Sequence, residues 1–193
     1  SHNPLQSLRL SEKAVYDRLN VSNSDLASLD LRKIKVRELN CANNKLTSLK
    51  VKKGKTVRYI SCENNQLKTL DMRGCSGIRE LSCEKNKLSR LYLKGCRNLY
   101  QLICSNNRLG KMDLRSCTKL EVLYCGKNNL KELNVKPCKR LRYLHCNNNK
   151  LIKLDLRFCK NLLEVYCFKN KLKKGGLKIS NSPEAMWGLK IKR

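Results

Sequence analysis

The chain has 193 residues, of which 43 are Lys or Arg and 15 are Asp or Glu, so its formal net charge is +28 at pH 7. This length suffices for one hydrophobic core. No apolar run approaches the roughly 18 residues that a membrane-spanning helix needs. The composition therefore predicts a single soluble domain and argues against a transmembrane helix within these residues.

Residues 1–18 precede the regular pattern of the chain and are predicted to form an N-terminal cap. Within them, Ser11 is a suitable N-cap for a short helix that reaches Leu19. Leu19-x-Val21 then opens the first repeat, with Val21 in place of a cysteine and Ser24 in place of an asparagine. The register of this first repeat is one residue short of the later ones.

Residues 19–174 are predicted to consist of about seven to eight units of 21 residues. A full unit reads Leu-x-x-Leu-x-Cys-x-x-Asn-x-Leu, and a period of 20–29 residues with this pattern is the signature of a leucine-rich repeat. The first cysteine series is Cys41, Cys62, Cys83, Cys104, Cys125, Cys146 and Cys167. The asparagine series is Asn44, Asn65, Asn86, Asn107, Asn128, Asn149 and Asn170. A second cysteine series is Cys75, Cys96, Cys117, Cys138 and Cys159.

The alternation Leu81-x-Cys83 predicts a short strand with both side chains inward. Stacked units bring such strands side by side at about 4.8 Å in one parallel sheet. Leu88, Leu91 and Leu93 return along the other side. The predicted fold is an α/β-type leucine-rich repeat solenoid, a right-handed arc with the parallel sheet on its concave face. Its convex side is expected to be mostly irregular or built of short extended or 3-10 segments.

The asparagine and cysteine series both have structural explanations. An asparagine amide can bond buried backbone groups in its own turn and the next, and a ligand-binding asparagine row is the alternative. Free cysteine behaves as a small buried hydrophobe, and neighbouring rungs hold their Cβ vectors parallel, which is poor disulfide geometry. We therefore expect 12 reduced, buried thiols. Without a C-x-x-C motif or a histidine partner, no metal site is predicted.

The repeat pattern ends at Gly175-Gly176, and residues 175–193 are predicted to form a C-terminal cap. Ser182 followed by Pro183 is typical of a helix start, which predicts a helical turn from Pro183 to Gly188. Trp187 and Leu189 are expected to cover the last rung, because terminal repeats need caps.

The Cys-x-x-Asn-x-Leu unit resembles the cysteine-containing leucine-rich repeats of bacterial surface proteins, which include internalin J-like proteins and proteins of treponemes and the Bacteroidetes. The resemblance covers about Leu19 to Leu172. It implies an exported, periplasmic or cell-surface protein that functions in attachment to host cells or to other bacteria. No signal peptide is visible in residues 1–193, and the start at Ser1-His2 leaves a removed export signal open.

Three positions of each predicted strand point away from the core, and together they form what we call the sheet face. Of its 24 positions, one is basic and five are acidic, so the other 42 basic residues lie elsewhere. Its first half carries the acids Glu38, Glu63, Glu80 and Glu84. Its second half is predicted to bind a protein, a peptide or an apolar ligand in a partly apolar recess formed by Ile103, Val122, Tyr124, Tyr143, His145, Tyr166 and Phe168. The alternative is that tyrosines simply suit strand positions.

Basic residues form rows along the repeat elsewhere. The row that we call the basic flank comprises Lys52, Arg73, Lys94, Arg115, Lys136 and Arg157. A second row beside the asparagines comprises Lys45, Lys87, Arg108, Lys150 and Lys171. Such rows are either solvated faces or sites for a polyanion such as a glycan, an anionic lipid or a nucleic acid. Nucleic acid is the least supported, because the aromatic residues lie on the acidic face and not among the lysines.

Catalytic motifs are not found in the sequence. The histidines are His2 and His145, and no nucleophile elbow, phosphate loop or metal motif occurs, so neither an enzyme nor a cofactor is predicted. Glu80 and Glu84 flank one strand without an obvious pocket. We therefore predict a non-enzymatic interaction protein that binds a protein or peptide through its sheet face. Polyanion binding through the basic flank is the alternative, and self-association stays open.

Overall fold

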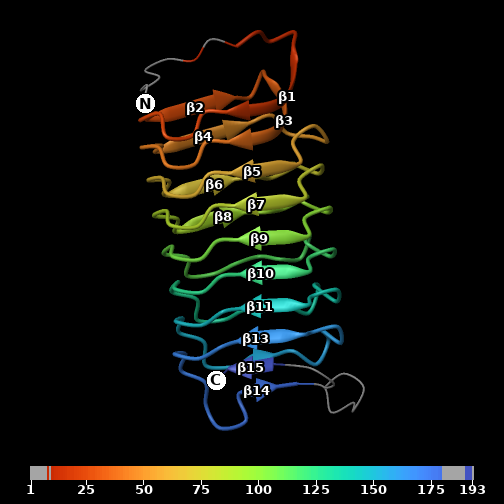
Figure 1. Ribbon diagram of the computed structural model, residues 1–193. Helices are drawn as coiled ribbons and strands as arrows, with labels where there is room; N and C mark the ends of the chain where they lie inside the picture. Colours follow the sequence, from red (N-terminus) through yellow and green to blue (C-terminus); the bar gives the residue numbers. More distant parts are fainter. Residues whose placement is uncertain (1–7, 9, 180–189, 193) are drawn as a thin grey trace.

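The computed structural model describes residue 8 and residues 10–179 and 190–192, and it shows one elongated stack of short strands (Figure 1). Its main feature is a parallel sheet of nine strands in the order β1-β3-β5-β7-β9-β10-β11-β13-β15. The strands are β1 (Val15–Asn20), β3 (Lys35–Asn40), β5 (Tyr59–Ser61), β7 (Glu80–Ser82), β9 (Gln101–Ile103), β10 (Val122–Tyr124), β11 (Tyr143–His145), β13 (Glu164–Tyr166) and β15 (Lys190–Lys192). Each strand begins a new rung of the stack.

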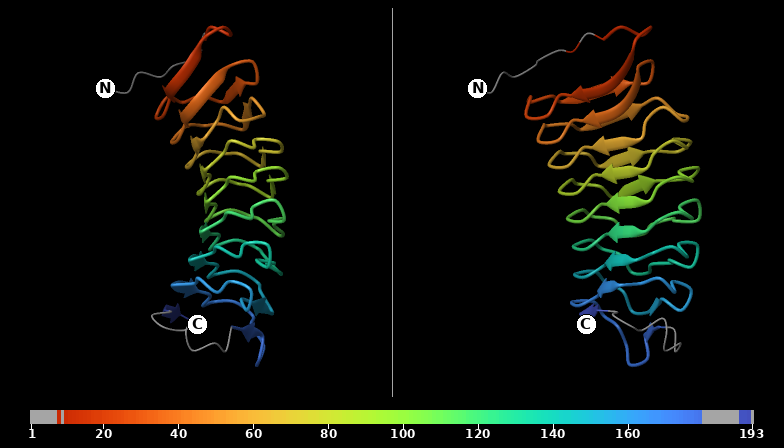
Figure 2. Two further views of the ribbon diagram at one scale, coloured as in Figure 1. Left: turned by 90° about the vertical axis from the view of Figure 1, so that its right-hand side faces the viewer. Right: turned by 45° about the vertical axis from the view of Figure 1, so that its right-hand side comes forward.

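The returning segments form the opposite side of each rung. They include three parallel two-stranded pairs. These are β2 (Ser28–Leu31) with β4 (Ser48–Val51), β6 (Thr69–Asp71) with β8 (Arg90–Tyr92), and β12 (Leu154–Asp155) with β14 (Leu177–Lys178). Between β8 and β12 the returning segments have no regular strands. Figure 2 shows that the stack is a shallow arc with the nine-stranded sheet on its inner side, which confirms the predicted leucine-rich repeat solenoid.

A continuous core of leucines and cysteines lies between the two sides of the stack. All 12 cysteines are buried and none forms a disulfide bond in the described chain, as the sequence predicts. Burial raises the pKa of the Cys41 thiol and of the Cys125 thiol to about 12. Reactive cysteines are thiolates, so these side chains are chemically inert at neutral pH and act as packing groups.

The asparagine series bonds each rung to the one before it. Asn107 is representative: its Oδ1 accepts from the backbone N–H of Leu88 at 2.9 Å. Its Nδ2 donates to the carbonyl of Cys83 at 3.0 Å and to that of Cys104 at 3.1 Å. The prediction that these amides serve their own turn is confirmed, but the second partner is the preceding repeat and not the next one. Each amide therefore joins its own turn to the preceding rung.

The residue before each of these asparagines has a left-handed backbone. Its φ is 54° at Asn43, 56° at Asn106 and 54° at Asn148, where asparagine tolerates this region well. In alternate repeats the same position is a lysine, with φ of 51–53° at Lys85, Lys127 and Lys169. The turn geometry therefore holds across the stack even where the residue is unfavourable for it.

The chain ends differ from the prediction. The expected helix from Ser11 to Leu19 is wrong, because β1 occupies this region and pairs in parallel with β3 from Val15 to Asn20. Strand-forming side chains and an available sheet edge outweigh the N-cap signal of Ser11, whose backbone N–H instead donates to the Tyr16 hydroxyl at 2.9 Å.

At the other end, β14 and β15 extend both sides of the stack beyond residue 174. The predicted helical turn at Pro183 to Gly188 and the predicted cover by Trp187 and Leu189 lie outside the described residues. The division into an N-terminal cap, a repeat region and a C-terminal cap stays a prediction.

Candidate functional site

One column of side chains crosses four strands in the second half of the sheet face. The register places Ile103 on β9 opposite Tyr124 on β10, Tyr124 opposite His145 on β11, and His145 opposite Tyr166 on β13. Buried leucine or valine and cysteine positions flank these residues, and alternation along a strand turns them outward. β15 adds Lys192 beyond Tyr166. The fold therefore assembles this column from segments 21 or more residues apart.

Three of these rings form a continuous stack, which we call the ring stack. The ring centres of Tyr124 and His145 are 4.1 Å apart with an angle of 7° between their planes. Those of His145 and Tyr166 are 4.2 Å apart with an angle of 6°. These distances are below the strand spacing of about 4.8 Å, so the rings are in face-to-face contact. A partner would thus meet ring edges and hydroxyl groups, except at the two ends of the stack.

A carboxylate fixes the polar side of the ring stack. Glu164 Oε1 lies 2.5 Å from His145 Nε2, and Glu164 Oε2 accepts from the Tyr166 hydroxyl at 3.2 Å. The side chains of His145 and Glu164 are 22% and 23% exposed. Burial, followed by the negative charge of Glu164, raises the pKa of both Tyr124 and Tyr166. Both phenols therefore stay protonated and present a hydroxyl, while Lys192 Nζ lies 5.2 Å from the Tyr166 ring centre.

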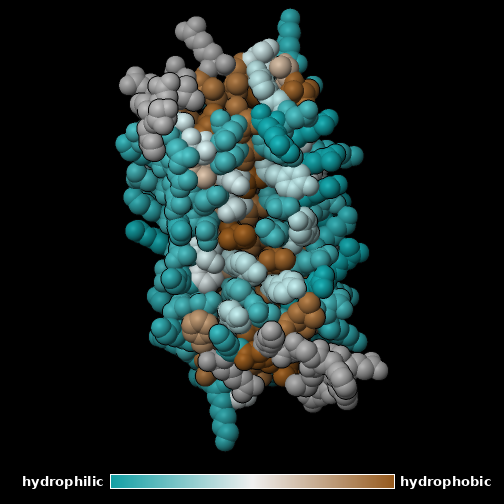
Figure 3. Space-filling model, in the orientation of Figure 1, coloured by the Kyte–Doolittle hydropathy of each residue, from teal (hydrophilic) through white to brown (hydrophobic). Residues whose placement is uncertain are grey.

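The other predicted aromatic and apolar residues lie around the ring stack. The Phe168 ring is tilted by 47° against Tyr166, with centres 6.4 Å apart. Tyr143 and Val122 are paired in the neighbouring column, and the Arg142 guanidinium carbon lies 5.9 Å from the Tyr143 ring centre. Figure 3 shows the sheet face as a narrow band of apolar and weakly polar surface between two hydrophilic rims.

All seven predicted residues thus share one partly buried face: Ile103, Val122, Tyr124, Tyr143, His145, Tyr166 and Phe168. The face-to-face stacking of the Tyr124, His145 and Tyr166 rings was not predicted. The partly apolar recess stays a prediction, and four cavities lined by described residues lie instead on the rim or the convex side.

The acidic half of the sheet face lies on β3, β5 and β7 and directly after them. Glu38 has an ion pair with Arg18 at 2.8 Å, and Glu80 accepts from the Tyr100 hydroxyl at 2.6 Å. Glu63 Oε2 is buried without a hydrogen-bond partner in the described chain. Among the described residues, Glu63 and Glu84 have no cation within ion-pair distance. The sheet face therefore keeps unmatched negative charge in a strongly basic protein.

The basic flank is partly neutralised by neighbouring aspartates. Arg73 is bound by Asp71 at 2.6 Å, and Arg115 and Arg157 are bound at 2.7 Å by the aspartates two residues before them. These guanidinium groups lower the pKa of the aspartates, to about 2 for Asp113. Lys52, Lys94 and Lys136 complete the row, and Lys136 Nζ lies 4.9 Å above the Phe158 ring. The flank is a weaker polyanion surface than the sequence pattern indicates.

A third set of cations, which the sequence reasoning missed, surrounds a cavity of about 470 Å³. This cavity, the rim groove, lies where the convex turns lead back into the sheet. Its cations are Lys55, Arg58, Arg79, Lys119 and Arg140. Two 21-residue steps, from Arg58 to Arg79 and from Lys119 to Arg140, are the sequence signal that marks it.

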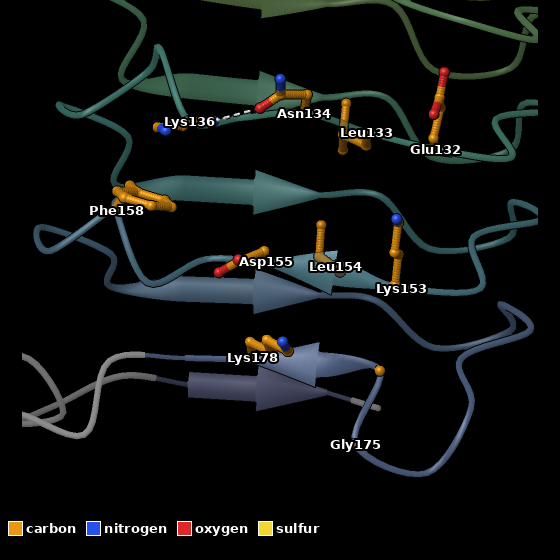
Figure 4. Close-up of a pocket in the computed structure, with 11 residues that line it drawn as sticks. Glu132, Leu133, Asn134, Lys136, Lys153, Leu154, Asp155, Phe158, Gly175 and Lys178 are labelled. Atoms are coloured by element: carbon orange, nitrogen blue, oxygen red, sulfur yellow. Dashed lines mark hydrogen bonds between the residues drawn. The ribbon is translucent and has the colours of Figure 1, made fainter.

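A further cavity of about 430 Å³ opens on the convex side between three successive rungs (Figure 4). Leu133 and Leu154 supply its apolar lining, beside the 39% exposed Phe158. Lys136 covers the Phe158 ring, and Asp155 is held by Arg157. Lys136 and Asp155 thus already have partners within the chain, and we place the candidate site on the sheet face instead.

Neither a metal-binding group of side chains nor a membrane-spanning helix is found among the described residues. No group of three or more His, Cys, Asp or Glu side chains among them is placed to hold a metal ion. No helix in this part of the chain is both long enough and apolar enough to cross a bilayer.

Comparison with known proteins identifies the fold. No protein-family model matches the chain, and no curated protein matches its sequence. Among solved structures, the functional domain of InlJ from Listeria monocytogenes, which includes a cysteine ladder, is 26% identical with a TM-score of 0.63, over 92% of this chain and 47% of that one. YopM from Yersinia enterocolitica is 25% identical with a TM-score of 0.79, over 99% of this chain and 40% of that one.

A third similar structure, a Shigella effector leucine-rich repeat domain, is 20% identical with a TM-score of 0.66, over 85% of this chain and 80% of that one. It supports the fold alone. The chain spans less than half the length of the InlJ and YopM chains that it matches.

Proposed function

Because the chain is a leucine-rich repeat solenoid with a cysteine ladder, we propose that it is a non-enzymatic interaction module whose protein partner binds the aromatic half of the sheet face. Solenoids of this kind are protein-interaction modules that use extended concave surfaces. The observation that carries the proposal is the ring stack of Tyr124, His145 and Tyr166 with its Glu164 contact. It is an ordered aromatic anchor on the sheet face, which carries one basic residue among its 24 positions from Arg18 to Phe168.

The geometry of the ring stack favours a protein partner. Aromatic side chains with a polar edge are typical of the residues that dominate binding energy at protein interfaces. Their rings are already stacked and hydrogen-bonded, so binding orders few additional side chains and loses little conformational entropy. Phe168 and Val122 beside the stack offer apolar contact, while the tyrosine hydroxyls offer hydrogen bonds. A segment with an apolar side chain flanked by polar backbone fits this combination.

The setting of this interaction is a further part of the proposal. The resemblance of the Cys-x-x-Asn-x-Leu unit to the repeats of bacterial surface proteins implies an exported or cell-surface protein that functions in adhesion, and we include this setting in the proposal. Binding of a second copy through the same face is the alternative partner. Polyanion binding through the basic flank has less support, because aspartates match Arg73, Arg115 and Arg157.

Site-specific crosslinking tests the proposal. A photo-crosslinking phenylalanine at Tyr143 reports on the sheet face, and the same group at Tyr92, which is 37% exposed on the convex side, is the matched control. After incubation with host-cell and bacterial-envelope extracts, we expect a discrete adduct from position 143 and none from position 92. An adduct with the chain itself would identify self-association. Equal labelling at both positions, or only at position 92, would refute binding at the aromatic half of the sheet face.

A further inference from the structure

Backbone hydrogen bonds between successive rungs fix the positions of the residues that line the rim groove. The backbone N–H of Arg79 donates to the carbonyl of Arg58 at 2.7 Å, that of Tyr100 to Arg79 at 2.9 Å, and that of Glu121 to Tyr100 at 2.8 Å. These bonds fix equivalent positions of successive repeats one rung apart, at about 4.8 Å. The side chains that line the groove therefore project from a regular, rigid row.

Within the described part of the chain, the cations of the rim groove form no ion pairs. No carboxylate of the described residues lies within ion-pair distance of Lys55, Arg58, Arg79 or Arg140. Lys119 Nζ instead donates to Asn98 Oδ1 at 2.8 Å. Such clustering of like charges is unfavourable in the free protein and raises the local concentration of anions.

The arrangement of these cations indicates the shape of their ligand. They come from four of five successive repeats, and these five repeats cover about 19 Å at the usual strand spacing. One small anion cannot reach all of them, whereas a linear chain with regularly placed anionic groups can. Guanidinium forks, as at Arg58 and Arg79, match the paired oxygens of oxyanions. Glu121 is the one acid in the lining, so the positive potential is strongest on the side of Lys55.

The aromatic content of the groove argues against a nucleic acid. Proteins that bind single-stranded nucleic acid combine a basic groove with aromatic rings on which bases stack. The one ring in this lining is Tyr100, whose hydroxyl is bound to Glu80. We propose that the rim groove binds a linear sulfated polysaccharide through the row of cations from Lys55 to Arg140. This site is separate from the sheet face and does not depend on the function proposed for it.

The test compares two variants of the full chain with equal loss of charge. The groove variant carries Lys55→Gln, Arg58→Gln and Arg79→Gln. The control variant carries Arg90→Gln, Arg108→Gln and Lys131→Gln, which are exposed, lie outside the groove and form no ion pair with any described residue. Binding of a fluorescent heparin oligosaccharide is measured for both at near-physiological salt, and a single-stranded RNA of equal charge is the comparison probe. Melting curves check that both variants fold.

We expect the groove variant to bind the heparin oligosaccharide at least tenfold more weakly than the wild type, and the control variant within threefold. A second variant, Lys119→Gln with Arg140→Gln, should weaken binding in the same direction from the other end of the groove. An equal loss in the control variant would mean general charge attraction and would overturn the proposal. So would tighter binding of the RNA than of the oligosaccharide, or no binding of the oligosaccharide by the wild type.

Discussion

Replacing Asn107 with alanine removes the side chain that joins two central repeats. Its Oδ1 is the acceptor for the Leu88 N–H, and its Nδ2 donates to the carbonyls of Cys83, Cys104 and Ser105 at 3.0–3.2 Å. The residue is 9% exposed, so water cannot take over these bonds. A buried N–H without a partner costs about 1–3 kcal/mol, and the lost bonds to three carbonyls add roughly 1 kcal/mol or more. We expect the free energy of unfolding to fall by about 3 kcal/mol.

Guanidinium chloride unfolding followed by circular dichroism measures this loss, with Asn129→Ala as the control. Asn129 is exposed and its side chain makes no hydrogen bond in the described chain, so its replacement should change stability by less than about 0.5 kcal/mol. Because solenoids can open locally, hydrogen exchange of the Leu88 amide gives a second reading and should become faster in Asn107→Ala. A stability loss below about 0.5 kcal/mol together with unchanged Leu88 exchange would refute the buried role of the asparagine series.

Three further outcomes follow from the buried thiols and the left-handed turns. Nearly all 12 cysteines should be alkylated in denaturant without reductant and few in the native protein; a mass that contains several disulfides would contradict this. The pKa of Cys125 rises from 9.0 to about 12 on folding, so stability that is present below pH 9 should decline toward pH 12, by about 1.4 kcal/mol per pH unit for each such thiol. Chemical unfolding at pH 8 and pH 10.5 tests this decline in stability. In Cys125→Ala, the slope of unfolding free energy against pH should correspond to one proton fewer. Lys127→Asn should raise stability by up to about 1 kcal/mol, because its φ of 53° suits asparagine, and a lower melting temperature would contradict this.

The fold was predictable because one pattern recurs with a fixed spacing. The pattern Leu81-x-Cys83 predicts both the alternation of a strand and the row of side chains that point into the core. The 21-residue spacing predicts the register in which the strands pair. The sheet-face residues follow directly, since they are the positions between the inward ones. The helix expected at Ser11 failed because its signal is local, whereas β1 forms through pairing with β3.

The contacts within the site depend on side-chain geometry, which the spacing of residues in the sequence does not predict. The sequence put His145 and the tyrosines on one face, but not the contact between His145 and Glu164 or the close stacking of three rings. Lys192 was missed because 25 residues separate it from Cys167, so β15 falls outside the repeat period. The rim groove was missed because its cations come from three positions of the repeat and not from one row.

The most direct test of the sheet face as the binding surface is the dissociation constant of the partner captured by crosslinking. It is measured for the wild type, for Tyr143→Ala with Tyr166→Ala, and for charge reversal at Arg115, Lys136 and Arg157. The account predicts that the double tyrosine variant melts nearly as the wild type does and binds about 30-fold more weakly, which corresponds to about 2 kcal/mol, while charge reversal changes affinity less than threefold. Wild-type affinity in the tyrosine variant, together with loss of binding on charge reversal, would contradict it and place the site on the basic flank.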